Sequence, residues 1–162
     1  DPGYVNTTKE YDGTNWTEGG TLPWPAGNIN NIGTLTAGLA VGGAIPPNTN
    51  NVATYDGTNW TTATSAPVPA VSNGSSGTQT DALIYGGILP SPHSTTTIKW
   101  DGSSWTTLSA TLGQGRNNGA ACGISPSSTQ AFYAGGDVSE TTVYANTEEF
   151  SSGPATVTIT TS

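Results

Sequence analysis

Tyr11-Asp-Gly-Thr-Asn-Trp16 recurs letter for letter as Tyr55-Asp-Gly-Thr-Asn-Trp60. A third copy reads Trp100-Asp-Gly-Ser-Ser-Trp105, and a shortened fourth copy reads Glu149-Phe150-Ser-Ser-Gly153. The leading aromatic residues stand at positions 11, 55, 100 and 150, a spacing of 44, 45 and 50 residues. A self-similar unit of this length is typical of architectures that repeat one supersecondary unit per period.

Pairs of adjacent glycines follow the same period. The pairs are Gly42-Gly43, Gly86-Gly87 and Gly135-Gly136. Each pair ends a short apolar run, at 37–41, 81–85 and 130–134. Two markers that stay in step over three periods indicate a true structural repeat.

Each period divides into four short segments, named A to D. Segment A is weakly apolar (29–32, 68–71 and 119–124), B is the run before the glycine pair, C leads into the aromatic residue, and D starts at the closing Trp. Asp-Gly between C and D is a strong hairpin signal, because both residues tolerate positive φ. Four short strands per period of 40 to 50 residues predict one β-propeller blade.

Composition supports an all-β protein and excludes several classes. The chain has 162 residues, 22 of them Gly, and carries 3 Lys and Arg against 11 Asp and Glu. Good helix formers are scarce, which argues against long helices. No run of 18 apolar residues exists, so we expect no membrane insertion. The few cations, Lys9, Lys99 and Arg116, cannot form a basic patch, so we expect no nucleic-acid partner.

Residues for catalysis are almost absent. The chain has one His and one Cys, which argues against most nucleophilic and zinc chemistry. Cys122 stands among Ala and Gly, and this setting predicts a small buried thiol. We therefore expect no enzymatic activity, no catalytic residue, no metal site and no cofactor.

The glycine pair closing B, the aromatic residue leading C and the Trp opening D together resemble the Kelch repeat over nearly the whole chain. The wording Tyr-Asp-Gly-Thr-Asn-Trp-Thr, with Gly77-Thr-Gln-Thr80 and Thr147-Glu-Glu-Phe150, resembles Kelch-like repeats in structural and tail-fibre proteins of aquatic bacteriophages. The resemblance implies a Kelch-like β-propeller-type fold. It also implies a structural and adhesive component of a tail fibre or virion appendage, located in the virion or outside the cell. Such a protein would recognise a host surface, with glycan as a ligand.

The repeats predict a single domain over 1–162. It consists of a half blade at 1–27, blades at 28–66 and 67–111, and a blade with the terminal strand at 112–162. This amounts to about three and a half four-stranded blades, whereas propellers close with four to eight. Three explanations stay open: assembly with copies of itself, further blades before Asp1, or an atypical four-bladed ring. The expected partners are the chain itself or other virion proteins.

The repeated residues are interpreted as structural, with the aromatic pairs packing between blades and the glycine pairs lying where blades crowd the axis. They are Tyr11, Trp16, Gly42, Gly43, Tyr55, Trp60, Gly86, Gly87, Trp100, Trp105, Gly135, Gly136 and Phe150.

The B–C and D–A connections differ in every copy and emerge on one face of a blade, where loops on a rigid scaffold usually bind. Their non-repeated residues Trp24, His93 and Arg116 are the candidate ligand contacts, although each could equally be a surface residue or an inter-subunit contact. An alternative function is a secreted or cell-surface bacterial propeller that polymerises or binds polysaccharide.

Overall fold

The structure is a computed structural model that describes residues 3–88, 93–122, 128–139, 142–152 and 157–161. Within these ranges it contains sixteen short strands and no helix. No helix in this described part of the chain is therefore long and apolar enough to cross a bilayer. The all-β prediction is confirmed.

Three antiparallel four-stranded sheets form the body of the molecule, each with its strands in chain order. The first contains β3 (Asn30–Thr34), β4 (Ala37–Val41), β5 (Val52–Tyr55) and β6 (Trp60–Ala63). The second contains β7 (Gly74–Thr78), β8 (Asp81–Tyr85), β9 (Thr97–Trp100) and β10 (Trp105–Thr107). The third contains β11 (Ala120–Cys122), β12 (Gln130–Ala134), β15 (Thr147–Ser152) and β16 (Val157–Thr161). These sheets are named here by their outer strands: β3–β6, β7–β10 and β11–β16.

Two hairpins complete the described strands. The first is formed by β1 (Lys9–Tyr11) and β2 (Trp16–Glu18) before the β3–β6 sheet. The second, β13 (Asp137–Ser139) with β14 (Thr142–Val143), was expected only as the B–C loop of the last repeat.

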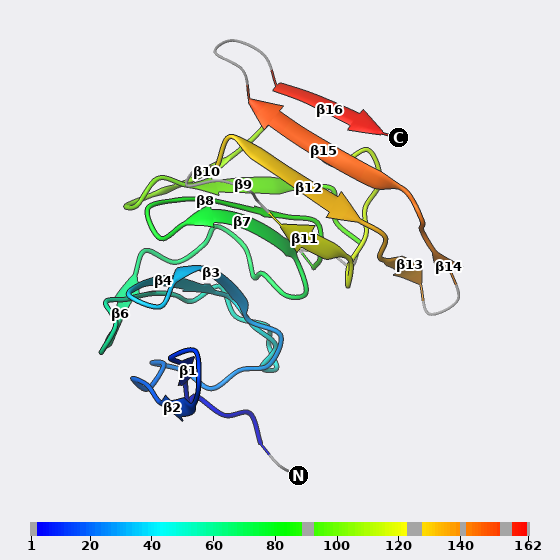
Figure 1. The fold of residues 1–162 in the computed structure, drawn as a ribbon. Helices are drawn as coiled ribbons and strands as arrows, with labels where there is room; N and C mark the ends of the chain where they lie inside the picture. Colours follow the sequence, from blue (N-terminus) through cyan, green and yellow to red (C-terminus); the bar gives the residue numbers. More distant parts are fainter. Residues whose placement is uncertain (1–2, 89–92, 123–127, 140–141, 153–156, 162) are drawn as a thin grey trace.

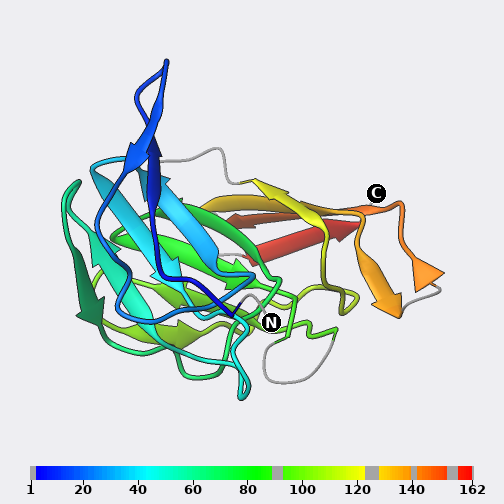
Figure 2. The same ribbon diagram turned by 90° about the horizontal axis from the view of Figure 1, so that it is seen from below.

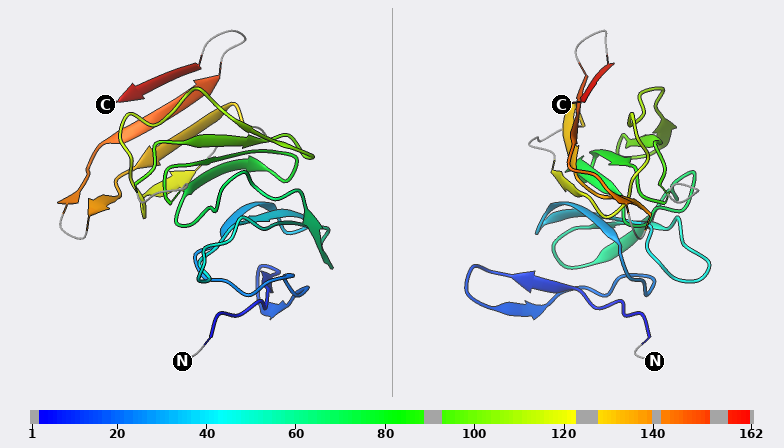
Figure 3. Two further views of the ribbon diagram at one scale, coloured as in Figure 1. Left: turned by 180° about the vertical axis from the view of Figure 1, so that it is seen from behind. Right: turned by 90° about the vertical axis from the view of Figure 1, so that its right-hand side faces the viewer.

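The sheets are stacked in a row along the chain, with β1–β2 at one end and β15–β16 at the other (Figure 1). Seen from below, the β1–β2 hairpin projects beyond the neighbouring sheet (Figure 2). The same projection is visible from the side, and the two termini lie at opposite ends of the stack (Figure 3). The first strands of successive sheets contact one another, β3 with β7 and β7 with β11, so they converge on one inner edge.

The core lies between the sheets. One cluster joins Val41 and Val52 of β3–β6 to Ile84, Ile98 and Trp100 of β7–β10. A second cluster joins the segment before β3 to the β3–β6 sheet, and a third joins β7–β10 to β11–β16. Central strands are consequently buried on both faces, and β8 is accordingly apolar and buried from Ala82 to Tyr85.

The C–D turns are closed by an aspartate side chain. Oδ1 of Asp56 accepts hydrogen bonds from the backbone N–H of Thr58 at 2.8 Å and Asn59 at 2.7 Å. These bonds lower the pKa of the Asp56 carboxyl. Only the glycine of Asp-Gly adopts positive φ, 94° at Gly57, so the aspartate serves as a hydrogen-bond acceptor and the glycine supplies the left-handed backbone.

The prediction for segment A of the second repeat is wrong by a few residues. The strand is β7 at Gly74–Thr78, whereas Val71 makes only an isolated bridge with Ile88. A Cβ atom at Gly74 would lie 2.3 Å from the Tyr85 ring, so this strand begins with a glycine where the sheet admits no side chain. The side chain of Cys122, predicted to be buried, lies outside what the structure describes.

Candidate functional site

The chain enters each four-stranded sheet through one residue in the left-handed conformation. These residues are Asn28 with φ 50°, Ser72 with φ 54° and Asn118 with φ 55°. Each stands two residues before the first residue of β3, β7 or β11. Non-glycine residues rarely adopt this conformation, and asparagine does so most readily. Because one such turn occurs before each of the three sheets, the turn is part of the repeated structure. Sequence reasoning missed it, although the spacing of the three residues matches the period.

These three turns converge on an open hollow of about 290 Å³ at the inner edge of the stack. Its lining comes from the segments through which the chain enters the three sheets, and it consists of Asn28, Ile29, Asn30, Ser72, Asn73, Asn118 and Gly119. The lining contains side-chain amides and a hydroxyl, and no acidic or basic residue. It lies beside the glycine pairs, on the side where the B–C and D–A connections meet.

Hydrogen bonds fix two of the amides of this hollow, those of Asn30 and Asn73. Nδ2 of Asn30, a buried residue, donates to Val41 O at 3.2 Å and to Asn73 Oδ1 at 3.4 Å. Nδ2 of Asn73 donates in turn to Gly86 O. The backbone N–H of Asn118 donates to Ser72 O at 3.4 Å, which ties the second turn to the third. The amides of Asn30 and Asn73 are thus ordered before any ligand binds, which lowers the entropic cost of binding.

The glycine pairs allow this convergence. A Cβ atom at Gly42 would lie 2.0 Å from Ala70 O of the following repeat. The backbone N–H of Gly43 donates to the same carbonyl at 2.9 Å, and that of Gly87 donates to Arg116 O at 2.7 Å. Close backbone approach between repeats therefore requires glycine at these positions.

The prediction of Trp24 as a ligand contact is wrong. Trp24 is only 5% exposed and packs in the cluster between the first hairpin and the β3–β6 sheet. Its Nε1 donates to Gly42 O at 3.1 Å. An indole that is buried and satisfied in this way offers no surface to a ligand.

The prediction of Arg116 as a ligand contact is also wrong. Its side chain is fully buried and ion-pairs with Glu148. Nη1 of Arg116 donates to Gly135 O and to Asn146 O, each at 3.1 Å. Glu148 Oε2 also accepts the backbone N–H of Gly113 at 2.5 Å. Both charges are satisfied internally, so this pair is part of the packing between repeats.

His93 is the remaining predicted contact. It is half-buried, with φ 59°, and its carbonyl oxygen lies against Gly115. It adjoins residues 89–92, which the structure does not describe. It is not among the residues that line the hollow, and its role in binding stays a prediction.

The aromatic pairs of the interior repeats pack onto the preceding sheet. Tyr55 and Trp60 stack with ring centroids 4.8 Å apart. The Tyr55 hydroxyl donates to the Glu10 carboxylate, which raises the pKa of Tyr55, and Trp60 Nε1 donates to Thr8 Oγ1 at 2.9 Å. Trp105 Nε1 likewise reaches back across the repeat boundary to Thr64 O at 3.0 Å.

Tyr11 and Trp16 do not follow this rule. They are 49% and 69% exposed, because no sheet precedes them in the described part of the chain. Packing between blades was expected for this pair as for the others, and within this chain that expectation is wrong.

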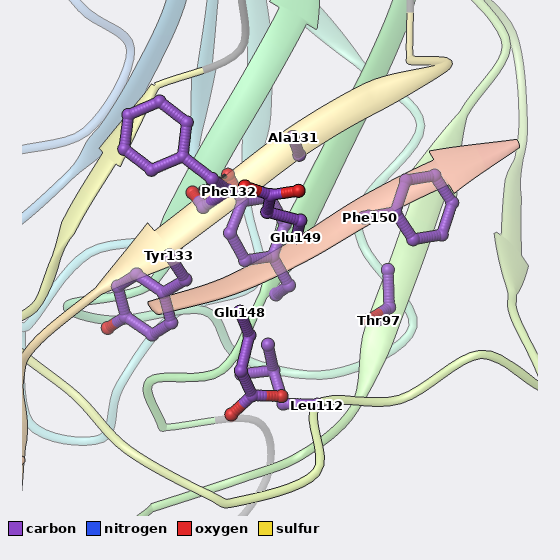
Figure 4. Close-up of a pocket in the computed structure, with 9 residues that line it drawn as sticks. Thr97, Leu112, Ala131, Phe132, Tyr133, Glu148, Glu149 and Phe150 are labelled. Atoms are coloured by element: carbon purple, nitrogen blue, oxygen red, sulfur yellow. Dashed lines mark hydrogen bonds between the residues drawn. The ribbon is translucent and has the colours of Figure 1, made fainter. Parts of the chain in front are cut away.

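A second, much smaller hollow of about 20 Å³ lies between the β7–β10 and β11–β16 sheets and has a mainly apolar lining (Figure 4). Glu148 and Glu149 extend to opposite sides of β15, as neighbours on a strand do (Figure 4). Because Glu148 is held by Arg116 and Glu149 faces away, the two carboxylates do not form an acid–base pair. No cluster of three or more His, Cys, Asp and Glu residues occurs among the residues whose placement is described.

The stacked four-stranded sheets, glycine-lined inner edge and cross-repeat aromatic pairs define a Kelch-like β-propeller fold. The solved structure of YjhT, a Kelch-repeat β-propeller protein, is similar to the chain with a TM-score of 0.77 and 16% sequence identity. The match covers 96% of this chain and 52% of YjhT, so the chain spans about half of that protein. No protein-family model matches the chain, and no curated protein matches it.

Proposed function

We propose that the chain is a non-enzymatic structural and adhesive component of a phage tail fibre or virion appendage. It binds a neutral host-surface glycan at the open hollow, through the exposed or half-buried side chains of Asn28, Ser72, Asn73 and Asn118. The observation that carries this proposal is the convergence of uncharged polar side chains from the three entry turns on one open face.

The chemistry of the lining supports a polyhydroxylated ligand. An amide supplies both donors and acceptors, and a sugar hydroxyl is also donor and acceptor, so the two groups can pair in either sense. The absence of charge in the lining gives no preference for ions. The net charge of −8 repels anionic polymers, which leaves neutral glycans as the favoured class.

The virion assignment rests on a different observation. It is supported by the wording of the repeats, Tyr-Asp-Gly-Thr-Asn-Trp-Thr above all, which resembles that of phage tail-fibre proteins. Detection of the chain in purified virions by mass spectrometry tests this part separately from glycan binding.

Glycan binding is tested by screening the wild type against an array of neutral oligosaccharides, then titrating the best hit. In Asn28→Gly the glycine tolerates φ 50° and removes only the amide, so the fold is kept while affinity falls. Asn15→Ala, at the exposed β1–β2 turn, is the control and binds as the wild type does. Equal affinity of Asn28→Gly and wild type, with the fold intact, would overturn this placement of the site.

A further inference from the structure

The first hairpin exposes a surface that is covered elsewhere in the same molecule. Tyr11 and Trp16 are largely exposed, whereas Tyr55, in the identical hexapeptide, is only 4% exposed. The Tyr11 hydroxyl turns back to its own turn and donates to Gly13 O at 2.9 Å. The corresponding hydroxyl of Tyr55 donates across the repeat boundary to Glu10. The structure thus shows what kind of surface covers this hexapeptide.

The surface that covers Tyr55 and Trp60 is formed by the β1–β2 hairpin and the residues just before it, and it carries two polar groups at fixed positions. Glu10 and Thr8 stand one and three residues before the leading aromatic residue Tyr11. They accept hydrogen bonds from the Tyr55 hydroxyl and from Trp60 Nε1. A surface that covers Tyr11 and Trp16 in the same way needs a carboxylate and a hydroxyl in this arrangement.

The last sheet carries the same two groups. Glu149 and Thr147 stand one and three residues before the aromatic residue Phe150. In the two middle repeats the residue before the aromatic is Thr54 or Lys99, so this combination of Thr and Glu occurs only in the first and last copies. The last strand C of the chain therefore has the acceptors that the first hairpin lacks.

These groups also lie on the open side of β11–β16. Phe150 packs towards β7–β10, so the alternating residues Thr147 and Glu149 face the other side of β15. Leu39 and Leu83, each three residues before a glycine pair, are fully buried under the following sheet. Phe132 stands at the same position and is only half-buried, because no sheet follows it in the described residues.

We propose that the β1–β2 hairpin of a second copy of this chain docks on β15 of the first, head to tail. Trp16 Nε1 donates to Thr147 Oγ1, and the Tyr11 hydroxyl donates to the Glu149 carboxylate. A second copy is the occupant because the chain itself carries both complementary faces. Moreover, the chain matches 52% of the YjhT propeller, so two copies supply about the length of one complete propeller chain. Each copy presents its hairpin to β15 of the other, and two such contacts related by a two-fold axis close the pair into a ring.

Sedimentation equilibrium on the 162-residue chain tests this contact. The wild type is expected at twice the chain mass of 16.4 kDa. Trp16→Ala and Glu149→Lys each remove one side of the contact and weaken association by ~30-fold or more, the effect of losing an interface hot spot. Val143→Ala, at an exposed residue of β14, is the control and stays dimeric. Circular dichroism checks that every variant keeps its strands.

Mixing the two variants separates this contact from a symmetric one. Trp16→Ala keeps an intact β15 and Glu149→Lys keeps an intact hairpin, so the mixture regains one good contact and associates more tightly than either variant alone. A wild type that stays monomeric at its highest soluble concentration would overturn the proposal. So would a dimer that Trp16→Ala breaks and Glu149→Lys leaves intact, because two hairpins would then be pairing with each other.

Discussion

The hexapeptides at 11–16 and 55–60 are identical in sequence and nearly identical in local structure, yet they lie in opposite environments. In each turn the backbone N–H of the aspartate donates to the asparagine carbonyl at 3.2 Å. The ring centroids are 5.2 Å apart in the first copy and 4.8 Å in the second. The tyrosine of the first copy is 49% exposed and that of the second is 4% exposed. The local sequence therefore determines the hairpin conformation, whereas packing against the neighbouring sheet determines how deeply the hairpin is buried.

The largest expected effect is on stability when the tyrosine of each copy is truncated. Tyr55→Ala should lower the free energy of unfolding by about 3–5 kcal/mol, because a buried aromatic ring leaves a cavity. Tyr11→Ala should lower it by about 1 kcal/mol or less, because about half of this residue is already exposed to water. Urea unfolding of both variants in the Glu149→Lys background, where association is removed, measures the difference. Equal losses would show that burial does not separate the two copies.

The position two residues before the aromatic residue sharpens the same comparison. Glu148 there forms a fully buried pair with Arg116, whereas Lys9 pairs with Glu18 at the surface. Glu148→Gln should cost about 3 kcal/mol, because it leaves the Arg116 charge buried without its partner. Lys9→Gln should cost about 0.5 kcal/mol or less, the usual value of an exposed ion pair. Thermal and urea unfolding of the two variants test this, and a Glu148→Gln protein as stable as wild type would contradict the buried pair.

Glycines with positive φ provide a smaller contrast. Gly42 and Gly13 both have positive φ, so alanine strains the backbone at either site. At Gly42 the added Cβ would also meet Ala70 O at 2.0 Å, whereas nothing lies within 4 Å at Gly13. Gly42→Ala should therefore be less stable than Gly13→Ala by about 1–3 kcal/mol, the cost of overpacking. Indistinguishable urea midpoints for the two variants would mean that the repeats are not in contact at the inner edge.

The smallest expected effect is the pH dependence of the turns. Backbone hydrogen bonds from Asn15 and Asn59 lower the pKa values of Asp12 and Asp56 in the folded chain. A lowered folded-state pKa gives stability that is present above the unfolded value of about 3.9 and is lost as the pH falls through the folded-state pKa. Asp12→Asn and Asp56→Asn should each be less stable than wild type near neutral pH and approach it below about pH 4. Urea midpoints measured as a function of pH check this. If only Asp56→Asn showed the pH dependence, the turn geometry would depend on the neighbouring β1–β2 hairpin and not on the local sequence alone.

The repeats made much of the fold predictable. Strands β5, β6, β8 and β9 were expected from the aromatic and glycine markers, since their signals are local. β7 was placed too early, because Gly74-Ser-Ser-Gly-Thr78 has no β-branched or aromatic run and forms a strand through its pairing with β8. β7 is also packed between β3 and β11, and these contacts with distant parts of the chain have no local signature.

The candidate site was less predictable. The face was expected from variation among loops, but two of its three candidate residues are buried. Arg116 finds its ion partner 32 residues further along the chain, and Trp24 finds its acceptor 18 residues away. The amides of the hollow were overlooked because asparagine is common in this chain. The turns at Asn28, Ser72 and Asn118 are distinguished by their positive φ angles, which cannot be read from the sequence.

Hydrogen exchange within one sample tests the central claim, that stacking of sheets and not the hairpin sequence buries the aromatic pair. Peptides covering 11–16 and 55–60 have the same side chains, so their intrinsic exchange rates nearly cancel in a ratio. In the Glu149→Lys monomer we predict that the hydrogen-bonded amides of 55–60 exchange more than about 100-fold more slowly than those of 11–16, since the second hairpin opens only when sheets separate. Equal exchange rates in the two hairpins would contradict the claim that stacking of the sheets protects residues 55–60.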